Sequence, residues 1–185
     1  MERPGNRSGG TAIIDVLMVF DTDLIYDSFG KKPPDADGVH WLPHGEAVKK
    51  FAYMIAQEEF VKSGMASPDL VLAVAHGDFI RWRAYSLNGN NNHVVGLNRI
   101  EHNTGPHIVD GFRPNADPFT LPIFNPVTQK IDEVPNYKDV YFESKIKEPG
   151  GTEAYKVYFE IINPLRKGGY ESLGRYAWDP DITYE

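Results

Sequence analysis

The sequence predicts an all-β protein, an antiparallel β-sandwich folded as a single domain. Apolar and polar residues alternate with period two over 70–87, 140–147 and 155–162, which is the pattern of half-buried strands. Aromatic residues make up 12% of the chain, and 17 Gly and 14 Pro are distributed between the apolar runs. Because aromatic side chains favour strands and Gly and Pro end them, we expect short strands joined by turns.

The first half of the chain supports this prediction unevenly. Ile13–Phe20 is an apolar run with one charge and predicts a strand buried on both faces or nearly so. Residues 27–45 are rich in Gly and Pro and predict a loop. Residues 46–62 have helix-favouring composition and helical spacing of apolar residues, so from propensity alone they predict a helix.

Two strands are predicted next, followed by a long irregular segment. Residues 69–75 and 79–87 flank the turn His76-Gly77-Asp78 and predict a hairpin in which Trp82 faces the core. Residues 93–100 predict another strand. Residues 101–136 contain six prolines and predict a loop that is either functional or disordered. Strands are expected again in the C-terminal part, at 140–147, 155–162 and 173–178.

The organisation of the chain predicts one domain with a short tail. Residues 1–11 are polar and Gly-rich and predict a flexible N-terminal tail, and 12–185 lack an internal repeat or linker. The N-terminus has no apolar segment of the kind found in signal peptides, and the chain has no cysteine. We therefore expect a cytoplasmic protein without disulfides.

The net charge is −7 and the isoelectric point is near 5.4. Nucleic-acid-binding proteins usually carry a basic stripe, and anionic membrane surfaces attract basic segments. The charge therefore argues against both partners.

Three segments resemble the AidA/PixA family of bacterial inclusion-body proteins. They are Ile14–Thr22 (IDVLMVFDT), Gly77–Leu87 (GDFIRWRAYSL) and Gly174–Ile182 (GRYAWDPDI), in the order that the family has them. The resemblance extends to Tyr53-Met54 and to 155–162, so it spans most of residues 13–185. The segments 27–45 and 101–136 depart from the family pattern.

This resemblance implies a compact, intracellular β-sandwich and replaces the helix expected at 46–62 with strands at 51–56 and near 58–62. It also implies protein inclusions, stationary-phase or quorum-sensing control of expression, and bacteria that associate with hosts. It implies no enzymatic activity. We therefore expect a non-enzymatic protein that self-associates as a dimer or larger assembly through sheet surfaces or edges, with Ile13–Phe20 as one candidate surface. The alternative is a carbohydrate-binding module.

No catalytic, cofactor-binding or metal site is predicted. The sequence has no Gly-x-Ser-x-Gly elbow, phosphate-binding loop or dinucleotide fingerprint. His40 and His44 are four residues apart, but Pro43 argues against the helix that would align them. The remaining histidines would form a metal site only if three ligands converged in space; they are His76, His93, His102 and His107.

Five residues are candidates for a structural or binding role. Asp15 lies within an apolar strand, and a buried carboxylate is costly unless it is paired. We expect a buried pair with Arg81 or Arg83, which lie in the strand at 79–87. Trp41 lies in a loop and Trp178 near a strand end, so these two are the expected ligand-binding aromatics, for example for sugar rings.

Overall fold

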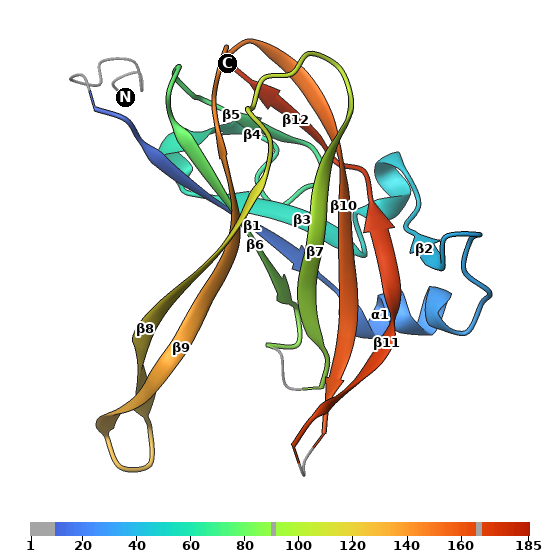
Figure 1. Ribbon diagram of the computed structural model, residues 1–185, viewed down its shortest axis with the longest axis vertical. Coiled ribbons are helices and arrows are strands. Elements are labelled where there is room, and N and C mark those ends of the chain that lie inside the picture. The colour runs from blue at the N-terminus through green and yellow to red at the C-terminus, as the bar shows by residue number, and fades with distance from the viewer. Residues whose placement is uncertain (1–9, 90–91, 166–167) are drawn as a thin grey trace.

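The computed structural model describes residues 10–89, 92–165 and 168–185 as a two-sheet β structure (Figure 1). The expected tail at 1–11 lies almost entirely outside the described residues. The strands are β1 Ile13–Phe20, β2 Val39–Trp41, β3 Ala52–Ala56, β4 Val61–Ser63, β5 Leu70–Leu72, β6 Phe79–Ser86, β7 Val94–Thr104, β8 Arg113–Asn125, β9 Lys130–Lys145, β10 Gly151–Pro164, β11 Tyr170–Trp178 and β12 Asp181–Tyr184.

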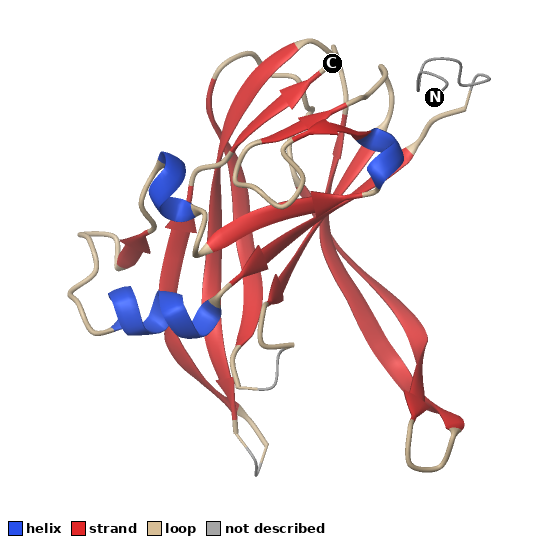
Figure 2. Cartoon of the chain, turned by 180° about the vertical axis from the view of Figure 1, so that it is seen from behind, coloured by secondary structure: helices blue, strands red, loops and turns tan. Residues whose placement is uncertain are grey.

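Among the described residues, helical structure is limited to short segments (Figure 2). They are α1 Thr22–Ile25, the π-turn η1 Tyr26–Gly30, which follows α1 directly, and the 3₁₀ turns η2 Gly45–Val48 and η3 Glu58–Phe60. The side chain of Asp21 caps α1 by accepting from the N–H of Leu24. Among the described residues, no helix is long and apolar enough to cross a membrane.

Two mixed sheets pack face to face, which confirms the predicted all-β sandwich. Within the described residues, one sheet has the order β3-β1-β6-β9-β8, and the other has the order β2-β11-β10-β12-β5-β4 with β7 on the far side of β10. Most neighbours are antiparallel, but β1–β6, β2–β11 and β5–β12 are parallel. Period-two alternation assigns a strand's faces but not its neighbours, so the sequence did not predict these parallel pairs.

The opening strand β1 lies inside its sheet, between β3 and β6. Ile14, Val16, Met18 and Phe20 point into the core and are fully buried. On the other face Ile13 is exposed, Asp15 and Leu17 are partly covered, and Val19 is buried at 7% exposure. Its edge towards β6 is paired along the whole strand, and its edge towards β3 is paired over Val16–Phe20, so little of its backbone is free to pair with another chain. Self-association through sheet surfaces or other edges stays a prediction.

Two expectations from the sequence need correction. Residues 70–72 and 79–86 do not form a hairpin: β5 belongs to one sheet and β6 to the other, so the turn at 76–78 crosses the sandwich. The helix favoured by propensity at 46–62 is absent as well. Strand β3 places alternate side chains in the core and confirms the strand that the resemblance implied at 51–56, whereas the short strand β4 begins only at Val61 and is partly buried to exposed.

The largest difference concerns residues 101–136, which were expected to be a loop. Strand β7 continues to Thr104, and β8 and β9 form a long hairpin from Arg113 to Lys145. Only the base of this hairpin is paired with the body of the sandwich, because β9 pairs with β6 over residues 142–145 alone. The rest projects away from both sheets (Figures 1 and 2). We call residues 116–140 the arm.

Candidate functional site

Charged side chains on the outer face of the first sheet tie the arm to the body. The guanidinium of Arg83 on β6 donates to both carboxylate oxygens of Asp139 on β9, with Nε 2.8 Å from Oδ1, and also to Asp15 on β1. These hydrogen bonds hold the pKa of Asp139 below its usual value. They begin just beyond the last backbone pairing of β6 with β9, Trp82 with Phe142. Arg83 therefore fixes the arm where its backbone leaves the body.

The structure differs from the expectation of a buried Asp15 pair. Asp15 contacts Arg83 rather than Arg81, and its side chain is 46% exposed. Arg81 instead donates from Nε to Glu143, 3.1 Å away. The pairs lie on the solvent side of β1 and β6 because the other face of these strands carries the core residues. They are surface pairs at the base of the arm, not core pairs.

Tyr141 completes the base of the arm. Its ring lies under the guanidinium groups of Arg81 and Arg83, 4.8 and 4.9 Å from the ring centroid. Its hydroxyl donates to Asp117 on β8, 2.7 Å away. One aromatic side chain therefore connects β6, β9 and β8.

Beyond its base, the arm exposes apolar side chains. Cross-strand neighbours Phe124 and Ile131 are paired, as are Leu121 and Val134, and the two pairs lie on opposite faces of the ribbon. The exposed large apolar residues of the arm are Ile123, Phe124, Val127, Ile131, Val134, Tyr137 and Val140. A lone two-stranded ribbon is at best marginally stable in water, and exposed apolar surface of this kind is typical of interaction sites.

Three prolines shape the outer edge of β8. Pro114, Pro118 and Pro122 are four residues apart, and β8 pairs with β9 on its other edge. Residues an even number of positions apart in a strand direct their backbone nitrogens to the same edge of that strand. Proline has no N–H to donate there. These positions therefore lack the donors that would let another strand add to β8. The surface available for contact is the faces of the arm, not this edge.

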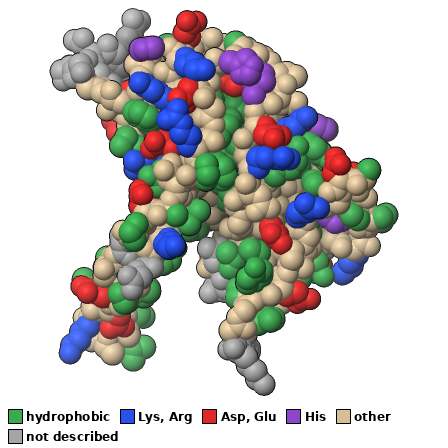
Figure 3. Space-filling model, in the orientation of Figure 1, with side chains coloured by type: hydrophobic (Ala, Val, Ile, Leu, Met, Phe, Trp, Pro, Cys, Tyr) green, Lys and Arg blue, Asp and Glu red, His purple; other side chains and the backbone are tan. Residues whose placement is uncertain are grey.

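An apolar groove lies where the arm leaves the body. It has a volume of about 290 Å³, and β6, β7 and β9 line it with Ala84, Tyr85, Val94, Val95, Gly96, Leu97 and residues 137–142. Figure 3 shows the hollow between the arm and the body. One side of the groove is the stretch of β6 beyond Trp82, which β9 no longer pairs. The groove is mainly apolar, with Lys138 and Asp139 among its lining residues, and it has strand backbone along its wall.

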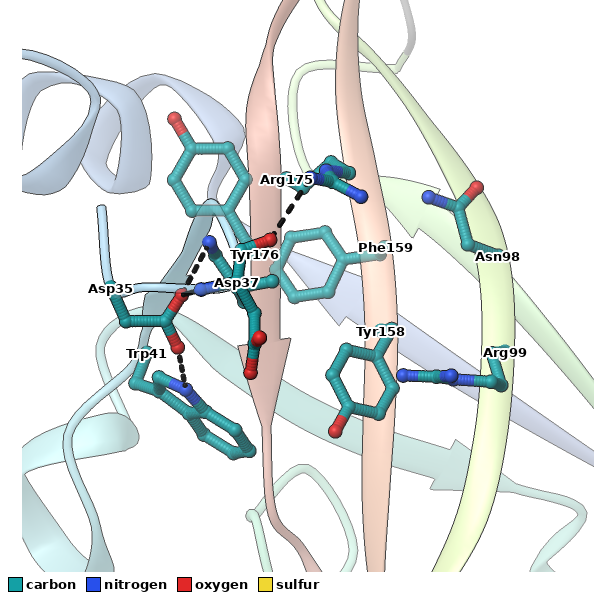
Figure 4. A pocket seen from close by; sticks show the side chains of 10 residues that line it. Asp35, Asp37, Trp41, Asn98, Arg99, Tyr158, Phe159, Arg175 and Tyr176 are labelled. Carbon is teal, nitrogen blue, oxygen red and sulfur yellow. Dashed lines mark hydrogen bonds between the residues drawn. The ribbon is translucent and has the colours of Figure 1, made fainter. Parts of the chain in front are cut away.

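A second, more polar pocket of about 580 Å³ lies on the outer face of the other sheet (Figure 4). Asp35 organises its rim by accepting from the backbone N–H of Asp37 and Val39 and from the indole N–H of Trp41, 2.9 Å away. The N–H of Val39 makes the largest contribution to a lowered pKa of Asp35. Trp41 lines the pocket from strand β2, not from the loop that the sequence predicted at 27–45, and its role in ligand binding stays a prediction.

A row of side chains crosses this face at the level of Trp41. Cross-strand pairing aligns Trp41 with Ala177, Ala177 with Tyr158, and Tyr158 with Arg99. The small side chain of Ala177 lets the two aromatic rings meet edge to face, 6.0 Å between centroids. Arg99 stacks over Tyr158 at 4.2 Å, and Arg175 reaches the carbonyl of Asp37 nearby (Figure 4). Aromatic surface and hydrogen-bonding groups therefore lie side by side.

Trp178 is placed differently. Its side chain is 1% exposed and packs edge to face against Phe20 in the core, with ring centroids 5.7 Å apart. The position of Trp178 near a strand end suggested exposure, but the facing sheet covers it. Tyr158, Arg99 and Arg175 were not among the expected site residues. The alternation of 155–162 assigns Tyr158 to the wetter face, but only the strand pairing brings it to Trp41.

Comparison with known proteins identifies the family. The family model described as PixA, inclusion body protein, matches residues 12–184. The chain belongs to the PixA family of inclusion body proteins. No curated protein sequence matches it. The crystal structure of an inclusion body protein (PixA) from Burkholderia cenocepacia J2315 is similar, with a TM-score of 0.74 at 18% identity over 97% of this chain and 99% of that chain.

Membership in the PixA family supports an inclusion-body-type protein, and the family's description names no enzymatic activity. The match begins at residue 12 and runs to the last strand, so it includes both sheets and the arm. The similarity to the Burkholderia structure shows a shared fold.

Proposed function

We propose that this PixA-family chain is a non-enzymatic protein that self-associates, and that its arm forms the contact between copies. The observation that carries the proposal is the apolar surface on both faces of the projecting ribbon. The partner is a second copy, because the same chain carries an apolar groove at the base of the arm. An arm seated in the partner's groove, and the reverse, makes a two-fold arrangement, the commonest symmetry of oligomers.

Two features support face-to-face contact in particular. The prolines of β8 remove donors from the outer edge of the arm, so strand addition there is disfavoured. Arg83 binds Asp139, whose side chain lies on the opposite face of β9 from Val140 and Phe142, so the pair holds the arm in place at one side of the groove, which Asp139 helps to line. An inclusion built this way forms from folded molecules rather than from unfolded chains.

Analytical ultracentrifugation over a concentration series tests the proposal. The variant Phe124→Asp/Ile131→Asp places two carboxylates on one exposed pair and should raise the dissociation constant at least roughly tenfold. A matched control is Tyr170→Asp, another exposed aromatic in the body. The control should associate as the wild type does.

A second variant tests the whole arm. Residues 118–138 can be replaced by Asn-Gly, a two-residue turn that joins the paired Asp117 and Asp139. It should remain folded and monomeric. Wild-type protein that is monomeric at millimolar concentration, or an armless variant that associates as the wild type does, would contradict the proposal.

Carbohydrate binding at the polar pocket is the second candidate function. The row of Trp41, Tyr158 and Arg99 favours it, because an aromatic face beside charged hydrogen-bonding groups suits a sugar ring. A glycan array with wild-type protein and with Trp41→Ala tests it. Binding that is lost in Trp41→Ala and kept in Tyr170→Ala supports it, and the absence of any glycan signal rejects it.

The resemblance to the family also supports a proposal about where and when the protein accumulates in the cell. We infer that the protein acts in the cytoplasm of a bacterium, accumulates in stationary phase or under quorum-sensing control, and serves in host association. Immunoblots of the source cells through growth, with cell fractionation, test the time and place of accumulation.

A further inference from the structure

Two histidines and a buried glutamate converge where the end of β7 lies beside the start of β10. They are His102 on β7, His107 in the segment that follows β7, and Glu153 on β10, and their ligand atoms all lie within 4.8 Å of one another. The imidazole rings stack with centroids 3.8 Å apart. We propose that these three side chains bind one divalent transition-metal ion such as Zn²⁺.

The backbone brings the three residues together through a bulge and a tight turn. The pairing of β7 with β10 shifts by one residue between His102 and Thr104, which re-aims the end of β7. Gly105 then turns the chain with φ of +92°, and a Cβ there would lie 2.5 Å from the carbonyl oxygen of Thr152. Only glycine fits at position 105, and this glycine allows the tight turn that brings His107 back to Glu153.

Hydrogen bonds orient the buried carboxylate of Glu153 as they would orient a metal ligand. Its side chain is 1% exposed. Oε2 accepts from the backbone N–H of Ile108 and Val109, at 2.8 and 3.3 Å, whereas Oε1 faces Nδ1 of His102 at 2.9 Å. One oxygen is therefore anchored by the backbone, and the other is directed at the histidines. A buried carboxylate oriented by outer hydrogen bonds is typical of metal ligands.

The exposure of the cluster suits ion entry. His107 is exposed and His102 is partly exposed, so the cluster opens to solvent on the side of the imidazoles. Zinc takes two His and one Glu with a free fourth position in known protein sites, with Zn–N bonds of about 2.0–2.1 Å. In a tetrahedral site such bonds place the ligand atoms roughly 3.3 Å apart, so the widest separation must shorten by up to about 1.5 Å. Rotation of the exposed His107 side chain provides this movement without disturbing Glu153.

The alternative is that Glu153 and His102 form only a structural pair beneath a stacked ring. His107 distinguishes the two readings, because among the described residues the histidine hydrogen-bonded to Glu153 is His102, and loss of His107 would leave that pair intact. A matched control is His44, which also lies beside a carboxylate, with Nδ1 2.7 Å from Asp179, but has no third ligand within the described residues. Both histidines are exposed, so neither alanine variant should unfold.

Isothermal titration of the full chain with ZnCl₂, after removal of metals with a chelator, tests the site. We expect one saturable site in the wild type and in His44→Ala, and at least a tenfold weaker one in His107→Ala and His102→Ala. Co²⁺ should give a visible absorption spectrum of a low-coordinate ion that His107→Ala lacks. No saturable Zn²⁺ binding, or equal binding by wild type and His107→Ala, would overturn the proposal. Circular dichroism verifies that each variant is folded.

Discussion

The body and the arm both present apolar side chains on one face of β9, but these side chains are buried in the body and exposed in the arm. Phe142 and Val140 are two residues apart on β9 and point to the same face, yet Phe142 is 7% exposed and Val140 is 58% exposed. In the body, the opposing sheet covers this face. Along the arm, the strand continues and the opposing sheet does not. The arm is therefore a continuation of a core-type face without a core, and its apolar residues are available to another molecule.

The largest expected effect tests this contrast within one strand. Phe142→Ala should lower the free energy of unfolding by about 3–5 kcal/mol, because it removes a large side chain from the packed core. Val140→Ala should change it by less than about 0.5 kcal/mol in dilute, dissociated protein, since that side chain is already in water. Urea denaturation at low protein concentration measures both. Similar losses for the two variants would mean that the arm packs on the body in solution.

The second prediction tests whether the prolines of β8 prevent another strand from pairing with the outer edge of the arm. Pro118→Val/Pro122→Val restores two backbone donors on the outer edge of β8 and adds β-branched side chains there. We expect larger, heterogeneous assemblies by light scattering, with the fold unchanged by circular dichroism. Pro180→Val, outside the arm, is the control. If the arm variant scatters as the wild type does, the prolines do not protect this edge.

The same contrast explains what the sequence could predict. Alternation identified the strands at 79–86 and 155–162, because core burial on one face leaves a period-two pattern, and a continuous apolar run identified the strand at 13–20. In the arm the pattern fails, since both faces meet water in the isolated chain. Prolines there indicated a loop, whereas they lie on an edge strand, where their missing N–H is tolerated.

The candidate sites depend on strand neighbours, which alternation does not specify. Trp41 was expected at a site from its loop position, but Tyr158 and Arg99 reach it only through the pairings of β2, β11, β10 and β7. Likewise, His102 and Glu153 are 51 residues apart in the sequence and are joined by the pairing of β7 with β10. No local motif connects such residues.

A third prediction concerns the connection between arm and body in acid. Hydrogen bonds from Arg83 lower the pKa of Asp139 below its unfolded value of about 3.9. The stabilisation is therefore present above that value and is lost as the pH falls through the lower, folded pKa. Asp139→Asn should lower stability at pH 7 by about 1 kcal/mol and flatten the fall in Tm between about pH 5 and pH 2. Asp27→Asn, at an exposed surface pair, is the control and should leave the acid profile unchanged.

The smallest expected effect belongs to Asp15, the third member of the same connection. Asp15→Asn should cost about 0.5 kcal/mol or less, because the carboxylate is nearly half exposed and water replaces most of what it loses. Arg83 also keeps both hydrogen bonds to Asp139, and an Asn side chain can still contact Gln57, which now lies 3.3 Å from Asp15 Oδ2. The pair buried in the core that the sequence suggested would instead cost about 3–5 kcal/mol on losing one partner. Urea denaturation distinguishes these values easily. A loss in the higher range would mean that the arm, or a second copy held by it, covers Asp15 in solution, and the armless variant would then show a smaller cost for the same substitution.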